Sequence, residues 1–444
     1  MIPEPERAAL RPDQAAIPPG HSWNRLPLVG AACAVPGALI CLILGLGNPK
    51  QFFFSWLVSF LFFLSLAVGA LFFVLIQYAA QGGWGIVVRR IGETTFATLP
   101  VMAALFLPLL LGLHDLYSWS VPGAADHDAL LRWKAPYLNV PFFVIRAVIY
   151  FGSWSFIGLM YYRGSRRQDA TGDLLVSVRL RRFAGPAIIV LALTTAFASV
   201  DWIMSLTPHW YSTMFGVYFF SGSFVGFIAL LSVAAVAMRR AGLLDTIVTV
   251  EHLHDIGKLL FAFTAFWAYI AFSQFLLMWY ANLPEETIWY KARLEGSWKA
   301  VSVLLMAGHF GVPFFYLMGR DVKRHGWTLA LGGAWLLAMH FVDLYWQVMP
   351  TLHPDGVRPS VLDAAAFAAV GGCFVAAAGW LMRRQALVPL RDPKLPEFLN
   401  EVVLRDLKLG TSSVDLRLRR HGEEVSLEVL RTRGQIQVSI VLTH

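Results

Sequence analysis

Residues 52–80 read FFFSWLVSFLFFLSLAVGALFFVLIQYAA, an apolar run that contains no Asp, Glu, Lys or Arg. A helix of about 20 apolar residues is long enough to cross a bilayer. The whole chain of 444 residues resembles this run in composition: 57% is hydrophobic, 14% is charged, and the mean hydropathy is +0.59. Soluble domains average about 25% charged residues. The sequence therefore excludes a soluble or disordered protein and predicts an all-α integral membrane protein.

Nine other runs have a similar character. The predicted spans are 26–46, 52–80, 95–114, 138–162, 183–206, 212–238, 256–280, 298–319, 326–349 and 360–382. The first run lacks a small-residue cleavage site, so we expect a retained span rather than a cleaved signal. We expect three parts: a cytoplasmic N-terminal segment (1–25), a ten-helix membrane domain (26–384), and a cytoplasmic linker and tail (385–444).

The distribution of positive charge predicts the orientation. The formal net charge is +8, and eighteen Lys and Arg residues fall in the ends and loops on one side of the predicted spans, against six in the loops on the other. Loops rich in Lys and Arg stay in the cytoplasm. We therefore expect both termini to be cytoplasmic, and we interpret the positive charge as a topology signal rather than as a nucleic-acid-binding surface.

Two spans end with the same short pattern. Asp201 is followed by Pro208, and Asp343 is followed by Pro350, in both cases seven residues later. The second and sixth spans also each end in an arginine pair. The pattern predicts two four-helix bundles, spans 2–5 and spans 6–9, flanked by spans 1 and 10. Because four spans separate the matching positions, an axis along the membrane normal would relate the two bundles.

Ionisable residues inside a membrane are functional candidates. Most of them lie at the outer end of the predicted spans: His114, Asp115, Arg146, Asp201, His340 and Asp343. His340 and Asp343 are three residues apart and share a helix face. A histidine beside a carboxylate could accept protons from a quinol, or could relay protons without any quinone. The same groups could instead be structural clamps between helices, with Arg146 paired to Asp115 or Asp201.

A second set of polar residues lies at the inner end. His252, His254 and Asp255 enter the seventh span, and His309 lies within the eighth. These residues could form the inner part of a proton path. The alternative for the first three is a solvated helix start, and for His309 a hydrogen-bonded histidine within the bundle.

Motifs for bound cofactors are absent from the sequence. Cys33, Cys41 and Cys373 form no C-x-x-C-H haem site and no zinc or iron–sulfur spacing. A bis-histidine haem needs paired histidines at matching depth, and His309 and His340 could supply one pair at most. The sequence contains no P-loop, dinucleotide-binding or nucleophile motif. We therefore predict no metal site and no catalytic residue of the chain's own.

The tail differs from the rest of the chain. Apolar residues alternate at 414–418, 425–429 and 436–440, with Gly422 and Gly434 at the breaks. Alternation of this kind predicts a small β-meander. The alternative is a disordered tail.

The membrane part is similar to a known family. The ten spans in two units resemble the NrfD/polysulfide-reductase membrane subunits, and more narrowly the second ten-span subunit of bacterial alternative complex III, a quinol:cytochrome c oxidoreductase. The similar segments are Trp56–Phe60, Ala79–Trp84 with Arg89-Arg90, Leu113–Tyr117, Ser199–Leu206 and Tyr269–Gln274. The resemblance covers roughly residues 20–400.

This resemblance implies a role. The chain would be a subunit without a redox centre, in the bacterial inner membrane, assembled with an iron–sulfur protein, multihaem c-type cytochromes, a sister NrfD-like subunit and lipids, and in larger assemblies with a haem-copper oxidase. It would support oxidation of menaquinol or ubiquinol at the periplasmic side and translocate protons through its bundles. The alternatives are a purely structural scaffold and a secondary transporter.

Overall fold

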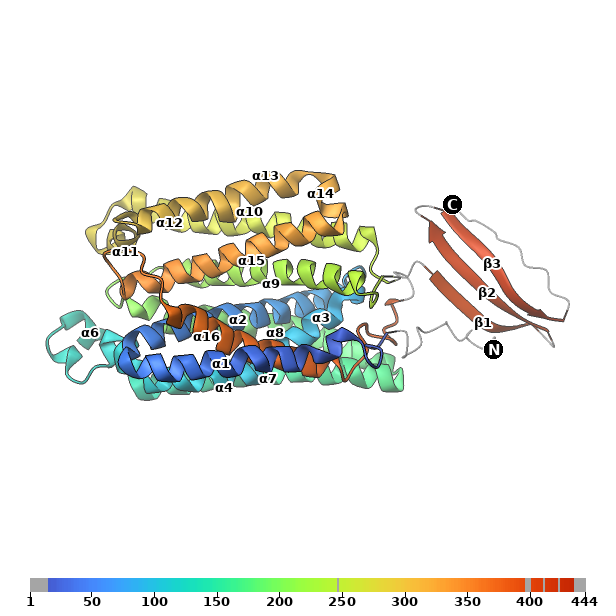
Figure 1. The fold of residues 1–444 in the computed structure, drawn as a ribbon, viewed down its shortest axis with the longest axis horizontal. Coiled ribbons are helices and arrows are strands. Elements are labelled where there is room, and N and C mark those ends of the chain that lie inside the picture. Colours follow the sequence, from blue (N-terminus) through green and yellow to red (C-terminus); the bar gives the residue numbers. More distant parts are fainter. Residues whose placement is uncertain (1–14, 246, 396–400, 410–411, 422–423, 435–444) are drawn as a thin grey trace.

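The computed structural model describes residues 15–245, 247–395, 401–409, 412–421 and 424–434. Within them, ten helices are long and apolar enough to span a membrane, so the chain is a multi-pass membrane protein with an all-α membrane domain. These helices lie side by side along one axis (Figure 1). They are α1 (Leu26–Gly47), α2 (Pro49–Ala79), α3 with α4 (Ile86–Phe96, Leu99–Leu111), α7 (Val140–Thr171), α8 (Leu174–Trp202), α9 (Phe215–Arg240), α10 (Val250–Ala281), α12 with α13 (Trp298–Leu305, Val312–Met318), α15 (Gly326–Val348) and α16 (Val361–Met382).

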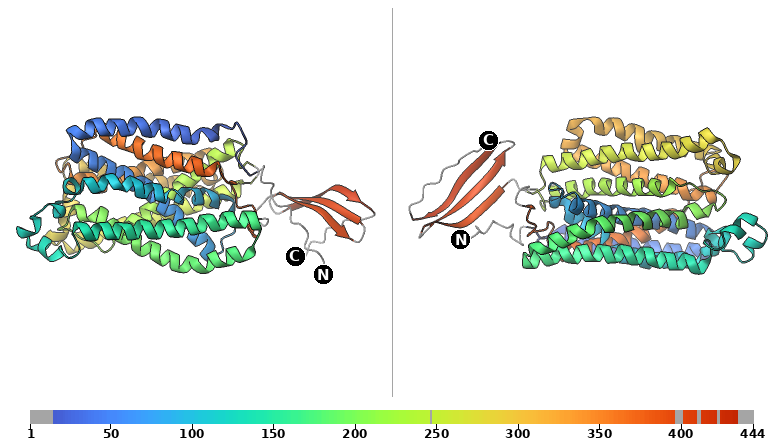
Figure 2. Two further views of the ribbon diagram at one scale, coloured as in Figure 1. Left: turned by 90° about the horizontal axis from the view of Figure 1, so that it is seen from below. Right: turned by 180° about the vertical axis from the view of Figure 1, so that it is seen from behind.

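Short helices mark the two ends of the bundle (Figures 1 and 2). We call one the α6 end, after α6 (Ala129–Lys134). It also carries α5 (Leu113–Leu116), α11 (Pro284–Leu294) and the 3-10 turns η4 (Met204–Leu206) and η6 (Met349–Thr351). The opposite end is the α14 end, after α14 (Arg320–Arg324). The charge distribution predicts that the α14 end is cytoplasmic.

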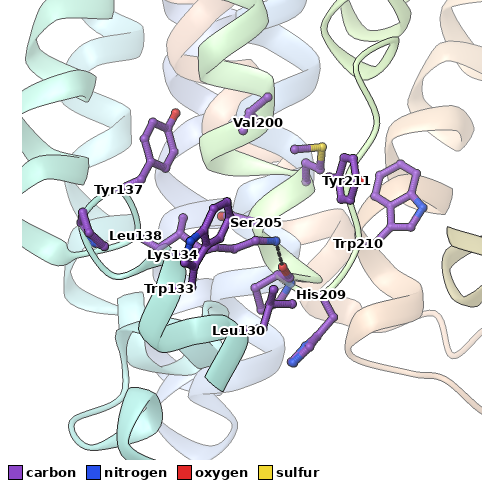
Figure 3. A pocket seen from close by; sticks show the side chains of 13 residues that line it. Leu130, Trp133, Lys134, Tyr137, Leu138, Val200, Ser205, His209, Trp210 and Tyr211 are labelled. Atoms are coloured by element: carbon purple, nitrogen blue, oxygen red, sulfur yellow. Dashed lines mark hydrogen bonds between the residues drawn. The ribbon is translucent and has the colours of Figure 1, made fainter. Parts of the chain in front are cut away.

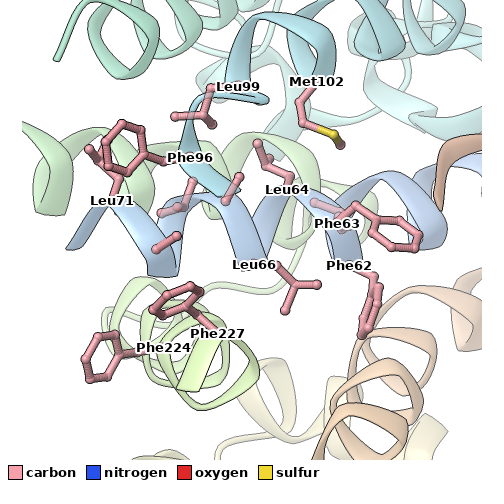
Figure 4. Packing of buried hydrophobic residues seen from close by; sticks show 14 of the residues in the cluster. Phe62, Phe63, Leu64, Leu66, Leu71, Phe96, Leu99, Met102, Phe224 and Phe227 are labelled. Atoms are coloured by element: carbon pink, nitrogen blue, oxygen red, sulfur yellow. The ribbon is translucent and has the colours of Figure 1, made fainter. Parts of the chain in front are cut away.

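Helices α2 and α9 form the centre of the bundle. They are the most thoroughly buried of the ten spans and pack against each other. Gly69 of α2 permits this approach, because a Cβ there would lie 2.3 Å from the backbone oxygen of Ser223 in α9. Large apolar side chains such as Phe62, Leu66 and Phe227 fill the surroundings (Figure 4). Each of these helices opens one predicted four-helix unit, so the two units meet through their first helices.

Several spans differ in their bounds from the predicted ones; α7 ends at Thr171 rather than near residue 162, and α8 begins at Leu174 rather than near residue 183. The third begins at Ile86 rather than near residue 95, so Arg89 and Arg90 lie inside helix α3 and not in a loop. The eighth is not one continuous α-helix, because the π-helical turn η5 (Met306–Gly311) separates α12 from α13. Pro313 follows this turn. Its ring conflicts with the carbonyl four residues earlier, which favours a wider turn at that position.

The tail forms an antiparallel meander, β1 (Glu401–Leu409), β2 (Ser412–His421) and β3 (Glu424–Arg433), in that order. Leu416 of β2 pairs with Leu404 on one side and Val429 on the other. The predicted strands at 414–418 and 425–429 are confirmed. The predicted strand at 436–440 lies outside the described residues, and β1 was not predicted.

Candidate functional site

Both carboxylate oxygens of Asp201, near the end of α8, accept hydrogen bonds from side chains of α7. The Arg146 guanidinium donates from Nε to Oδ2 (2.7 Å) and from Nη2 to Oδ1 (3.0 Å), and the Tyr150 hydroxyl donates to Oδ2 (2.7 Å). Arg146 also donates to the backbone oxygen of Tyr137 (2.9 Å) and lies over its ring. Because Asp201 and Arg146 are buried and opposite in charge, this group has the geometry of a clamp between α7 and α8.

Asp343, at the matching place in α15, has a different environment. Its carboxylate accepts a hydrogen bond from the Tyr218 hydroxyl of α9 (2.5 Å). Among the described residues, no lysine or arginine forms an ion pair with it. Asp343 is buried. It is therefore the carboxylate of the matched pair that lacks a direct cationic partner.

His340 lies one turn before Asp343 on the same helix and is also buried. Its Nε2 is 2.7 Å from the Ser65 hydroxyl of α2. Glycines of α9 make room for the imidazole: a Cβ at Gly226 would lie 2.7 Å from its Cδ2, and one at Gly222 would lie 3.3 Å from its Cε1. The apolar centre of the bundle is thus shaped around a histidine.

His309 lies in the π-helical turn, and its ring centroid is 3.8 Å from that of Trp267 in α10. Both imidazole nitrogens are buried and have no hydrogen-bond partner among the described residues. The same holds for Nδ1 of His340. We call Tyr218, Trp267, His309, His340 and Asp343 the Asp343 cluster. It brings together hydrogen-bonding side chains from α9, α10, η5 and α15 at the core of the second unit, and its carboxyl and imidazole groups can exchange protons.

Arg293 of α11 lies beyond this cluster at the α6 end, and the sequence analysis counted it only among the six Lys and Arg residues of the loops on that side. It is buried, and its guanidinium donates to the backbone oxygens of Trp346 (3.1 Å), Gln347 (2.6 Å) and Trp289 (2.8 Å). Burial lowers the pKa of Arg293 to about 9. Its spacing from Trp289, four residues earlier on the same helix, is the one signal that could have marked it, because the guanidinium packs over that indole at 3.5 Å.

The other predicted outer residues, His114 and Asp115, form no hydrogen bond or ion pair with either aspartate in the described part of the chain. His114 of α5 is exposed, and its Nδ1 is 3.2 Å from the Ser120 hydroxyl. Asp115 beside it is partly exposed. We expected Arg146 to pair with Asp115 or Asp201, and in the structure it pairs with Asp201.

The predicted inner residues form the start of α10. His252 and Thr249 make a capping box, in which each side chain accepts from the other's backbone N–H. Asp255 pairs with Lys258 (2.5 Å), and His254 is half-buried. Trp267, which contacts His309, lies about 20 Å along α10 from these residues, at a rise of 1.5 Å per residue. The local geometry is that of a solvated helix start.

A buried ionic network at the α14 end was missed by the sequence reasoning. Arg89 contacts Glu93 (3.2 Å) and Asp392 (2.7 Å), while Arg90 contacts Glu93 (3.1 Å) and Asp169. The sequence analysis used Arg89 and Arg90 for topology, for the two-unit pattern and for the resemblance, but did not predict their ion pairs. The network ties the segment after α16 to α3 and α7.

An apolar cavity of about 580 Å³ opens at the α6 end (Figure 3). Its lining consists of Leu130, Trp133, Lys134, Pro136, Tyr137, Leu138, Val200, Met204, Ser205, Pro208, His209, Trp210 and Tyr211. Lys134 donates to the backbone oxygen of Pro208 (2.5 Å), and burial lowers its pKa. Two lining residues, Tyr137 and Ser205, also contact the Arg146–Asp201 pair. None of the predicted site residues lines the cavity itself.

The described residues contain no group of three or more His, Cys, Asp or Glu side chains that could hold a metal ion. No protein-family model matches the chain, and no curated protein matches its sequence. The fold and these contacts define a multi-pass membrane protein with two different buried aspartates. Asp201 is paired with an arginine in one helical unit, and Asp343 has no cationic partner among the described residues of the other.

Proposed function

We propose that the chain is a proton-translocating membrane subunit of a quinol:cytochrome c (or oxidase) oxidoreductase complex, with the Asp343 cluster as its proton relay. The quinol is oxidised at the α6 end, which the charge distribution predicts to be periplasmic. The resemblance stated above supplies the redox partners of this proposal, and the contacts of Asp343 support the relay.

The observation that carries the relay is the contrast between the two aspartates. The Asp201 carboxylate is bonded directly to the Arg146 guanidinium and to the Tyr150 hydroxyl, so it already has a counter-charge. Asp343 has one tyrosine hydroxyl and no paired cation among the described residues. Buried polar atoms without a protein partner are commonly satisfied by ordered water. Water beside the nitrogens of His309 and His340 would connect them to Asp343.

The test uses the assembled complex in proteoliposomes, with quinol and cytochrome c supplied and proton release recorded per electron. Asp343→Asn removes the exchangeable proton and keeps the shape of the side chain. We expect quinol oxidation to persist while protons released per electron fall at least twofold. Full coupling in an assembled Asp343→Asn complex would refute the relay and favour a scaffold.

A second role is supported by the cavity at the α6 end. An apolar pocket with a few polar groups suits an amphiphile with a hydrogen-bonding head, and a quinol has this character. We propose that the quinol head approaches Lys134 and Tyr137 there. A photoreactive quinone analogue should label this region, and Lys134→Leu should reduce the labelling; the matched control Arg132→Leu, outside the lining, should not. Equal labelling in Lys134→Leu would contradict the assignment.

A further inference from the structure

Each helical unit places one buried arginine near the end of its aspartate helix, but the two arginines make different bonds. Arg146 is bonded to Asp201 directly (2.7 Å). Arg293 is bonded instead to the backbone oxygens of Trp346 and Gln347. These residues are three and four positions after Asp343, so they lie one turn beyond it on the same helix.

Pro350 explains why a backbone oxygen is available to Arg293. The carbonyl of Trp346 would ordinarily accept from the N–H four residues later, and proline has none. Arg293 Nε fills that position at 3.1 Å. In this arrangement Arg293 is a cap on the end of α15, with its guanidinium packed over Trp289.

In the described part of the chain, the groups around Asp343 include no lysine and no arginine besides Arg293. They include Tyr218 from α9, Trp267 from α10, His309 from η5, His340 and Gln347 from α15, and Tyr290 and Arg293 from α11. Asp343 and Arg293 both act electrostatically on Tyr218 and Tyr290, so both charges lie near the same two tyrosines. An ionised carboxylate that is buried without a counter-charge is strongly destabilised.

We propose that Arg293 is a positioning residue that controls release of the proton from Asp343. While Asp343 is protonated, Arg293 caps α15. When the proton leaves Asp343 for water at the α6 end, the guanidinium turns to the carboxylate and forms the pair that Arg146 and Asp201 form in the other unit. Reprotonation from the side of His340 returns Arg293 to the backbone oxygens. This inference rests on the proposed relay function of Asp343.

Infrared difference spectra of the intact complex during quinol turnover, with and without ¹⁵N-labelled arginine, test the exchange. We expect the band of a protonated carboxyl to disappear together with a shift of guanidinium bands, and both changes to be absent in Asp343→Asn. A carboxyl change without a guanidinium shift would overturn the exchange and leave the relay standing. No carboxyl change assigned to Asp343 would overturn both.

Variants provide a second measurement. Arg293→Gln should lower protons released per electron at least twofold in the wild-type background and cause no additional loss in Asp343→Asn, while Arg293→Lys should retain part of the yield. A purely structural cap would instead give equal losses in both backgrounds, which would overturn the proposal. If Arg293→Gln does not assemble, the infrared experiment on the wild-type complex decides alone.

Discussion

Arg146 and Asp201 are joined by two hydrogen bonds, of 2.7 Å and 3.0 Å, across the contact between α7 and α8. The planar guanidinium matches both carboxylate oxygens, a geometry that lysine cannot reproduce. The corresponding aspartate, Asp343, has a tyrosine in this place. Two positions that read alike in the sequence therefore differ in the charge that surrounds them.

Removing one partner of the first pair should damage the fold. Asp201→Asn leaves the Arg146 guanidinium buried without its counter-charge, and breaking a buried pair in this way costs about 3–5 kcal/mol. We expect lower thermal stability in detergent and poor assembly. The double variant Asp201→Asn/Arg146→Gln should recover part of the loss, and exposed Arg132→Gln should have no effect. Normal stability of Asp201→Asn would contradict the clamp.

His309 should matter for proton transfer more than for folding. His309→Phe keeps an aromatic ring against Trp267 and removes two nitrogens that have no hydrogen-bond partner among the described residues. We expect the complex to assemble and to oxidise quinol with fewer protons released per electron. His254→Phe, at the solvated start of α10, is the control and should retain the full proton yield. Equal yields in the two variants would argue against His309 in the relay.

The packing of α1 against α16 depends on small residues. A Cβ at Gly30 would lie 2.4 Å from the backbone nitrogen of Ala376. Gly30→Leu should therefore push the two helices apart and lower the melting temperature of the purified protein. Gly47→Leu is the matched control on the same helix, because a Cβ there meets nothing within 4 Å. Equal melting temperatures for the two variants would show that α1 does not need this close approach.

Asp392 should hold the segment after α16 in place. It accepts from Arg89 at 2.7 Å, and both side chains are buried. Asp392→Asn removes the charge and should increase amide hydrogen exchange in residues 385–395. Lys394→Gln is the control, because Lys394 donates to the backbone oxygen of Gln81 from an exposed position. Unchanged exchange in Asp392→Asn would mean that other contacts hold the segment.

The sequence by itself determined the membrane class and the approximate position of all ten spans, since insertion depends on the apolar character of each local stretch. It also indicated the two-unit pattern and two of the three observed strands. The sequence did not predict the π-helical turn at His309 or the early start of the third span, because both depend on how a helix packs and not on its mean hydropathy.

Only the tertiary structure decided which polar groups meet. Asp201 and Asp343 are each followed by proline seven residues later, yet Arg146 reaches the first and Tyr218 the second. Arg293, a loop charge in the sequence, proves to be buried against the end of α15. Partners such as these come from helices far apart in the chain, and hydropathy carries no information about which side chain faces which. The fold class is therefore a local property of this sequence, whereas the environment of each buried charge is a property of the packed bundle.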